Sequence, residues 1–262
     1  MKNSVKWCAM LVVALTFASC SDDGSFNMYT VEQDIEFGKQ YVAEFESSGQ
    51  VTLLNETEYS TAYSMLNNYK NAILNSGEVK HKDDFEWRLK IIRDDNTVNA
   101  FCVPGGYIYV YTGLIKNLQD ESELVGVLGH EMAHADKRHS TEQMTKAYGL
   151  SMLTEILLGG SSSKWRTLTD ITTGLFSLKF SRNDETEADT YAVKYEYQTK
   201  WDARGVGSFF ARAGSSDGWA ILSTHPTNES RVDNVNKQWN SLGGKEGEYG
   251  ESDFQTLKNS IR

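Results

Sequence analysis

The segment His130-Glu131-Met132-Ala133-His134 places two histidines and a glutamate within five residues. Two histidines four residues apart on an α-helix lie one turn apart and about 40° apart around its axis, so both imidazoles can face one metal ion. Zinc suits neutral imidazole nitrogen, and Glu131 stands where a general base for a metal-activated water is needed. The segment therefore predicts a helix that carries a catalytic zinc site.

The residues before this motif favour a buried helix. Asp120 is placed to cap the helix, with Glu123 three positions later, and an apolar run follows. Gly126 and Gly129 lower helix propensity, which indicates close packing where the motif begins. Two unpaired histidines and a glutamate would be expensive to bury, whereas a metal ion satisfies them. The alternative is a solvated helix face whose histidines bind nothing.

The motif supplies two ligands, and a catalytic zinc site needs a third. A metzincin would have glycine at 137 and histidine at 140, but this chain has Lys137 and Ser140. His139 lies nine residues after His130, about 180° around an ideal helix, so it is expected to face away from the metal as a surface or helix C-terminal residue. Replacing His81 or His139 is therefore expected to leave zinc binding unchanged.

An acidic segment further along the chain offers the third ligand. Glu185 and Asp189 lie one helical turn apart, beside an apolar helix face. We expect Glu185 to be the carboxylate ligand and Asp189 to accept the second ring N–H of a ligating histidine. The alternative is that acids in a first helical turn only complement the helix dipole, which accounts for Asp184 and Glu187 but not for Asp189.

The remaining sequence predicts a mainly helical α+β domain with one small sheet and no internal repeat. The pattern of apolar residues predicts helices near 30–47, 57–75, 119–138, 141–158, 165–179, 184–199, 203–213 and 227–241, followed by a short C-terminal helix. Strands rich in β-branched and aromatic residues are predicted at 85–93, 97–103 and 106–112.

The N-terminus predicts export. Two lysines precede a short apolar run within residues 1–19, which is typical of a signal peptide. The run ends in Ala18-Ser19-Cys20, which resembles a lipobox, so lipidation is predicted at Cys20. The alternative is an ordinary signal peptide that is cut near Ala18. Residues 20–29 are expected to form an acidic tether, in which residues 21–25 resemble an export tag, and the domain is expected to span 30–262.

Composition limits the partners of the chain. With 39% hydrophobic and 24% charged residues and three cysteines, it is neither disordered nor a disulfide scaffold. Its net charge is -10 and no run of lysine and arginine exceeds two residues, so no nucleic-acid partner is expected. Cys102, in a strand-like run, is expected to be a buried small hydrophobic residue. We expect an outer-membrane lipoprotein, on the periplasmic face or the cell surface.

Residues 30 to 240 resemble the gluzincin metallopeptidases of family M48, which include HtpX-type, Oma-type and BepA-like enzymes. The sequence lacks flanking transmembrane helices and a tetratricopeptide array, so it is most similar to the compact lipoprotein branch. Four ordered pieces carry the resemblance: Asn99-Ala100-Phe101 with Pro104-Gly105-Gly106, His130-Glu131-x-x-His134, Ser181-Arg182 with Glu185-x-x-x-Asp189, and Thr224-His225-Pro226 with Arg231.

The resemblance implies a zincin-like domain whose edge strand borders the active site and pairs with an extended polypeptide substrate. Asn99 would then hold a substrate carbonyl. His225 and Arg231 would contact the site, where either could stabilise the oxyanion. In BepA-like enzymes the equivalent histidine can instead occupy the open zinc position and keep the enzyme latent.

These observations predict a zinc-dependent endopeptidase with one zinc ion per chain, which hydrolyses unfolded or misassembled envelope proteins. Glu131 would act as the general base and then as the proton donor. The alternative is a lipoprotein chaperone or assembly factor that binds outer-membrane clients with little or no proteolysis. A purely binding role gives Glu131 no obvious use.

Overall fold

A three-stranded sheet and the long helix behind it organise the chain in the computed structural model. The structure describes residues 19–20, 26–147, 179–214, 218–226 and 229–262. Its helices are α1 (Val31–Ser47), α2 (Ser60–Leu74), α3 (Thr112–Asn117), α4 (Glu121–Asp136), α7 (Arg182–Tyr197), α8 (Gly205–Ala213), α9 (Ile221–Thr224), α10 (Glu229–Ser241) and α11 (Glu251–Ser260), with a further helical stretch over 139–147.

The sheet contains β3 (Arg88–Ile92), β4 (Ala100–Val103) and β5 (Tyr107–Tyr111) in the order β3-β5-β4. Strand β3 runs parallel to β5, whereas β4 is antiparallel to β5. A tight turn at Gly105 and Gly106, each with a φ of 84°, joins β4 to β5. The predicted small sheet is confirmed, and β4 lies at its edge. A separate two-residue pair joins β1 (Ser19–Cys20) to β2 (Phe26–Asn27).

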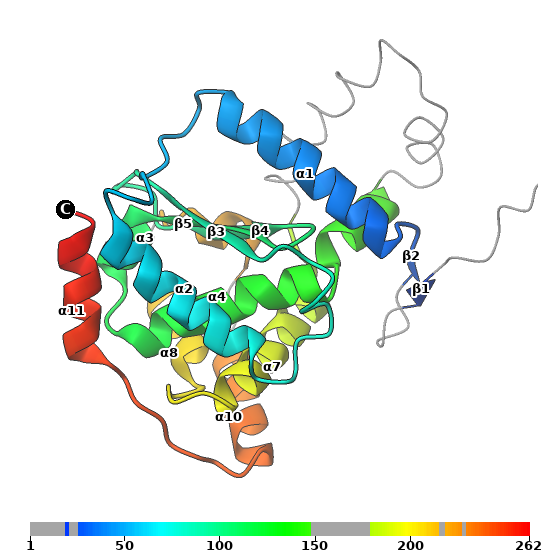
Figure 1. Cartoon of the computed structure of the whole chain (residues 1–262). Coiled ribbons are helices and arrows are strands. Elements are labelled where there is room, and N and C mark those ends of the chain that lie inside the picture. The colour runs from blue at the N-terminus through cyan, green and yellow to red at the C-terminus, as the bar shows by residue number, and fades with distance from the viewer. Residues whose placement is uncertain (1–18, 21–25, 148–178, 215–217, 227–228) are drawn as a thin grey trace, which may run out of the picture.

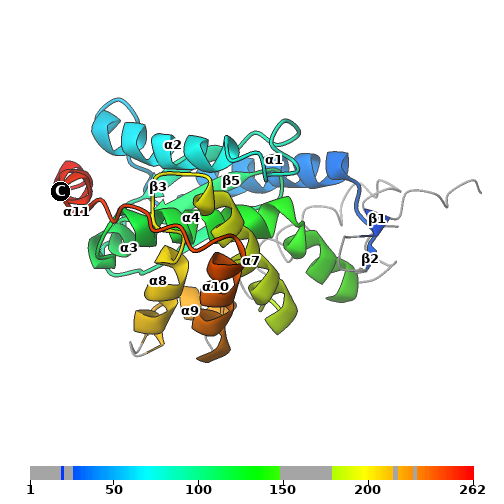
Figure 2. The same ribbon diagram turned by 90° about the horizontal axis from the view of Figure 1, so that it is seen from below.

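Helices cover both faces of the sheet (Figure 1). On one face α1 packs its aromatic residues, among them Tyr41 and Phe45, against Tyr107 and Tyr109 of β5. On the other face lie α2 and α4, and α7, α8 and α10 lie beyond α4 (Figure 2). Helix α4 is therefore enclosed between the sheet and a second helical layer, so its polar side chains are removed from water.

Helix α4 begins as the sequence predicts. The Asp120 side chain accepts a hydrogen bond from the Glu123 backbone N–H at 3.0 Å, and every residue of the helix is buried. Both glycines of α4 lie where another element approaches closely. A Cβ on Gly126 would stand 2.3 Å from the backbone nitrogen of Val206, and one on Gly129 would stand 3.4 Å from Ala192. Close packing of α4 against α8 and α7 is thus confirmed.

Helix α4 ends at Asp136, and the chain turns sharply before it becomes helical again at His139. Arg138 has a φ of 64°, a left-handed conformation that ends α-helices and is uncommon for a residue with a side chain. Its guanidinium is held by Asp34 of α1, with Nε 2.5 Å from Oδ2. The turn after α4 is therefore fixed by the N-terminal helix.

The other predicted helices are found within a few residues of their expected bounds, except for those that fall on undescribed residues. The predicted helix 165–179 lies outside the described residues except for its last position. Most of the predicted helix 141–158 also lies outside them. The short helices α3 and α9 were not predicted. Among the described residues no helix combines the length and the apolar character needed to span a bilayer.

Candidate metal centre

Four buried side chains from three parts of the fold converge on one point. His130 and His134 come from α4, Glu185 comes from the first turn of α7, and His225 follows α9. Each offers one nitrogen or oxygen ligand atom, and these atoms all lie within 4.8 Å of one another. The structure thus brings together the two histidines, the carboxylate and the late histidine that the sequence singled out.

The spacing of these donor atoms suits a tetrahedral metal ion. Bonds of about 2.0–2.1 Å in a tetrahedron place neighbouring donors roughly 3.3 Å apart. Nε2 of His130 lies 3.0 Å from Nε2 of His134 and 3.2 Å from Nδ1 of His225. Oε1 of Glu185 lies 3.0 Å from Nδ1 of His225 and 3.5 Å from Nε2 of His134. The set of two or three imidazoles and one carboxylate is typical of zinc.

The protonation of the cluster favours metal binding. Burial holds the pKa of His134 well below its usual value, so its ring is neutral and offers a lone pair. Burial opposes ionisation of Glu185, but His225 and His134 outweigh it and lower the pKa of that carboxyl. Burial also opposes protonation of His225, but Glu131 and Glu185 outweigh it and raise the pKa of the imidazole. A metal ion would therefore compete with a proton at His225.

Glu131 stands beside the four donors without being one of them. Its Oε1 accepts no hydrogen bond from any residue that the structure describes, and it lies 3.4 Å from Nε2 of His225. Burial raises the pKa of this carboxyl, which brings it closer to the range in which a group can accept and return a proton. The backbone N–H of Cys102 interacts with the same carboxylate, so β4 borders the site. Cys102 itself is buried and free, as expected.

Asp189 supports His130 from behind, on the side away from the other donors. Its Oδ1 lies 2.9 Å from Nδ1 of His130, whose Nε2 faces the metal group. Arg231 of α10 holds the same carboxylate through two hydrogen bonds, Nε to Oδ2 at 2.7 Å and Nη2 to Oδ1 at 2.6 Å. Burial opposes ionisation of Asp189, but Arg231 and His130 outweigh it and lower its pKa. The structure thus places Asp189 where the sequence expected an orienting carboxylate.

Arg231 lies fully buried and its guanidinium faces carboxylates. Besides Asp189, it approaches Glu185, with Nη1 2.8 Å from Oε2, and its plane lies over the ring of Phe210 at 3.5 Å. Burial alone would lower the pKa of Arg231, but Asp189 and Glu185 raise it. These contacts favour a role in which Arg231 holds the carboxylates of Glu185 and Asp189 in place. They fit less well with a guanidinium that is free to hydrogen-bond a substrate oxyanion.

The expectation for His139 was wrong. This residue is 1% exposed and begins the next helical stretch instead of ending α4. Its Nδ1 lies 2.9 Å from Nδ1 of His134, the ring nitrogen that points away from the metal group. The left-handed turn at Arg138 breaks the helix, so the ideal-helix angle of about 180° does not apply. Because it contacts His134, a candidate metal ligand, His139 cannot serve as a neutral control for zinc binding.

Sequence reasoning also missed two neighbours of these histidines. Glu187, which seemed only to complement a helix dipole, lies 3.3 Å from Nε2 of His139 through its Oε2. The Phe180 ring stacks on His134, with the ring centroids 3.9 Å apart. The sequence did contain one signal for these contacts. One predicted helix ends at 138 and the next begins at 141, which implies that the chain bends beside His139.

Asn99 lies directly before β4 and is partly buried. Its Oδ1 is shielded from solvent and accepts no hydrogen bond among the described residues. Its backbone carbonyl accepts a hydrogen bond from the N–H of Tyr111 at 3.1 Å, which extends the pairing of β4 with β5 by one residue. The side chain is therefore held at the end of the edge strand, with an unused amide oxygen.

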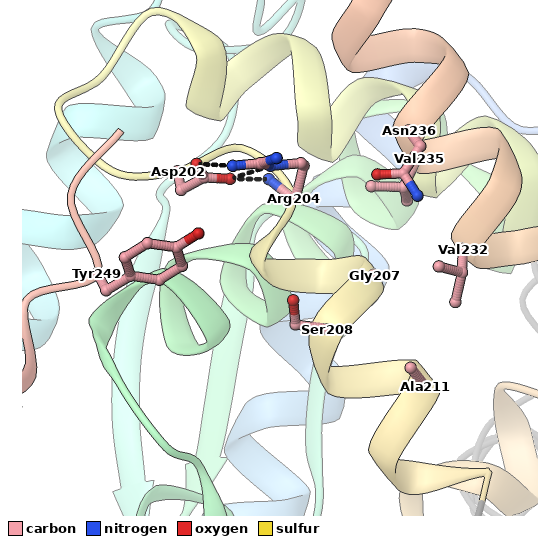
Figure 3. A pocket seen from close by; sticks show the side chains of 9 residues that line it. All are labelled: Asp202, Arg204, Gly207, Ser208, Ala211, Val232, Val235, Asn236 and Tyr249. Atoms are coloured by element: carbon pink, nitrogen blue, oxygen red, sulfur yellow. Dashed lines mark hydrogen bonds and ion pairs between the residues drawn. The ribbon is translucent and has the colours of Figure 1, made fainter. Parts of the chain in front are cut away.

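A cavity of about 310 Å³ lies apart from the metal group, where α8, α10 and Tyr249 meet (Figure 3). Asp202 and Arg204 form an ion pair at its rim, with Nη2 2.7 Å from Oδ2. None of the four metal-binding candidates contributes to its lining. The lining residues are Asp202, Arg204, Gly207, Ser208, Ala211, Val232, Val235, Asn236 and Tyr249.

An enclosed helix with two histidine donors, a carboxylate donor from a second helix and a free glutamate beside them defines a metallopeptidase domain. The chain belongs to peptidase family M48, whose family model matches residues 65–238. The predicted family is therefore confirmed.

Several curated proteins are similar to this chain. The mitochondrial metalloendopeptidase OMA1 of Arabidopsis thaliana is 32% identical over 155 residues, which cover 58% of this chain and 31% of that protein. Metalloprotease YcaL of Escherichia coli is 30% identical, over 53% of this chain and 57% of its own length. The beta-barrel assembly-enhancing protease of Escherichia coli is 26% identical, over 81% of this chain and 45% of its own length. The matched part of the chain spans between 31% and 57% of the length of these relatives.

Proposed function

We propose that this chain is a zinc-dependent endopeptidase that hydrolyses peptide bonds of unfolded or misassembled proteins in the bacterial envelope. The observation that carries this proposal is the convergence of four donor atoms within 4.8 Å beside a buried glutamate that is not a donor. A metal site that only stabilised the fold would not need such a glutamate next to its ligands.

The residues divide the reaction between them. A zinc ion held by His130, His134 and Glu185 would act as a Lewis acid toward the attacking water and the scissile carbonyl. Glu131 takes a proton from the water on a carboxylate oxygen as the water oxygen bonds to the carbonyl carbon. It then gives that proton to the leaving nitrogen as the C–N bond breaks. Asp189 keeps the Nδ1–H of His130 oriented throughout.

The edge strand supports an extended polypeptide as the substrate. Within the described part of the chain, strand β4 pairs with β5 on one side only, and its backbone meets the Glu131 carboxylate at Cys102. An extended segment that pairs with such an edge is bound mainly through its backbone, so recognition depends little on side chains. Asn99, at the start of β4, is the residue we assign to a substrate carbonyl.

The position of His225 supports a latent enzyme. Its Nδ1 lies 3.2 Å from His130 Nε2 and 3.0 Å from Glu185 Oε1, distances that suit a fourth protein ligand. With four protein donors the position needed by the reacting water is filled, and His225 must leave before catalysis. His225→Ala should therefore raise basal cleavage of unfolded casein, whereas a role in stabilising the oxyanion requires that this variant cleave more slowly.

Replacing Glu131 tests the proposed activity most simply. Glu131→Gln keeps the size of the side chain but removes the base, so we expect about one zinc per chain and at least a 100-fold loss of casein cleavage. Glu196→Gln is the matched control, because Glu196 is also a buried glutamate but lies outside the metal group. Retained cleavage in Glu131→Gln contradicts the assignment. Zinc binding without any cleavage by the unaltered chain favours the chaperone alternative.

The envelope location rests on the N-terminal sequence and on bacterial relatives, one of which is named a beta-barrel assembly-enhancing protease. We propose a lipid anchor at Cys20 in the outer membrane. Metabolic labelling with a clickable palmitate analogue should mark the chain and fail to mark Cys20→Ser. Treatment of intact cells with an impermeant protease distinguishes the cell surface from the periplasmic face.

A further inference from the structure

His139 and Glu187 form a pair behind the metal centre that the proposed reaction does not use. Nδ1 of His139 lies 2.9 Å from Nδ1 of His134, and Nε2 of His139 lies 3.3 Å from Oε2 of Glu187. His139 is fully buried, whereas Glu187 is partly exposed. Neither residue belongs to the four-donor group.

Metal binding fixes the direction of both hydrogen bonds. His134 directs Nε2 toward the other donors, so a neutral ring that binds a metal through Nε2 carries its proton on Nδ1. This Nδ1–H must donate to Nδ1 of His139. A neutral His139 then carries its own proton on Nε2, which faces the Glu187 carboxylate. The protons on Nδ1 of His134 and Nε2 of His139 therefore form one consistent chain of hydrogen bonds from His134 through His139 to Glu187.

The surrounding chain holds His139 in this place. The left-handed turn at Arg138 brings its imidazole back toward α4, and Asp34 of α1 fixes that turn through Arg138 Nε and Nη2. Phe180 stacks on the His134 ring, so the ring has little freedom to rotate. Packing alone does not require a histidine at position 139. A leucine would fill the same space but could not accept the hydrogen bond from His134.

We propose that His139, backed by Glu187, is a positioning residue that fixes the tautomer and orientation of His134 for zinc binding. This inference rests on the proposed zinc site. His139 is not an additional ligand, because its Nδ1 faces the ring nitrogen of His134 that points away from the donor group. It is the counterpart of Asp189, which accepts the outer N–H of His130 with a carboxylate oxygen instead of an imidazole nitrogen.

The test compares zinc affinity in purified full-length variants, by competition with a chromophoric chelator. His139→Leu retains the bulk but loses the acceptor, so it should weaken zinc binding about 10- to 100-fold. His139→Asn places an amide oxygen near the position of Nδ1 and should restore most of that loss. Glu187→Gln, which keeps a neutral acceptor, should weaken binding by less than His139→Leu. The matched control is His81→Leu, because His81 is also a buried histidine bonded to a carboxylate, that of Asp84.

Cobalt substitution adds a readout that packing does not move. The visible d–d spectrum of cobalt should shift in His139→Leu and return toward the original in His139→Asn, while His81→Leu leaves it unchanged. The proposal is overturned if His139→Leu binds zinc as tightly as the unaltered chain, or if Leu and Asn weaken binding equally. If His139→Leu does not fold, equal zinc affinity of Glu187→Gln and the unaltered chain overturns it. An unaltered chain that binds no zinc contradicts the proposed function instead.

Discussion

His130 and His134 lie one turn apart on α4, yet different chemistry supports their outer ring nitrogens. His130 faces the Asp189 carboxylate, which Arg231 holds with two hydrogen bonds. His134 faces a second imidazole, that of His139. Hydrogen bonds to a charged acceptor are roughly twice as strong as bonds between neutral groups. One helix therefore carries two proposed ligands of the same metal ion, of which His130 is strongly supported and His134 more weakly.

Removing the Asp189 carboxylate, which supports His130, should lower stability and zinc affinity more than removing the His139 imidazole, which supports His134. Asp189→Asn leaves Arg231 buried without its bidentate partner, which costs about 3–5 kcal/mol of unfolding free energy. We also expect a loss of zinc affinity of about 10- to 100-fold, at the upper end of that range. Urea unfolding and chelator competition measure the two effects.

Asp202→Asn is the matched control for this prediction. Asp202 is also buried and bound by an arginine through two contacts, Arg204 Nε to Oδ1 at 2.8 Å and Nη2 to Oδ2 at 2.7 Å, but it touches no histidine. Its replacement should lower stability and leave zinc affinity unchanged. Equal zinc affinities in Asp189→Asn and Asp202→Asn contradict the assigned role of Asp189.

A milder change separates charge from geometry on the His130 side. Arg231→Lys keeps a positive charge near Asp189 and Glu185 but cannot make the paired hydrogen bonds. We expect a several-fold weaker zinc affinity, smaller than the effect of Asp189→Asn. An affinity equal to that of Asp189→Asn would show that geometry, not charge, provides most of the support.

The His134 side can be weakened from a distance through the turn at Arg138. Arg138→Gly keeps the left-handed backbone but loses the contact with Asp34, so zinc affinity should fall a few-fold. Arg138→Ala should be less stable than Arg138→Gly by about 1 kcal/mol, because the left-handed conformation disfavours a Cβ. Unchanged zinc affinity in both variants would show that α1 does not influence His134.

Glu196 is a buried carboxyl on the same helix as Asp189, but no cation among the described residues pairs with it. Neither of its oxygens accepts a hydrogen bond from a described residue, and burial raises its pKa well above 4.5. The folded state therefore retains a proton that the unfolded chain loses above about pH 4.5, so stability falls as pH rises.

Glu196→Gln should accordingly be more stable than the unaltered chain at pH 8 and equally stable below pH 4, with no change in zinc affinity. Urea unfolding at several pH values measures this smallest effect. A stability difference that does not depend on pH would contradict the raised pKa and point to packing as its origin.

The sequence predicted those parts of the site that depend on short regular spacing. His130 and His134 follow helical periodicity, and Glu185 and Asp189 repeat it on α7, so helix geometry puts each pair on one face of its own helix. The sheet followed from its β-branched and aromatic runs.

The position of His139 could not be read in that way. It depends on one left-handed residue, and that conformation is stabilised by Asp34, more than 100 positions earlier in the chain. The contact of Arg231 with Asp189 likewise joins two helices that are distant in sequence. Such long-range ion pairs leave no periodic signal in a single sequence.

Anomalous scattering at the zinc edge, from crystals grown with one equivalent of zinc, would locate the metal ion. We expect a single strong peak among Nε2 of His130, Nε2 of His134, the Glu185 carboxylate and Nδ1 of His225, with Asp189 and His139 hydrogen-bonded to the outer nitrogens of the first two. A peak elsewhere, or none at this position, contradicts the proposed site.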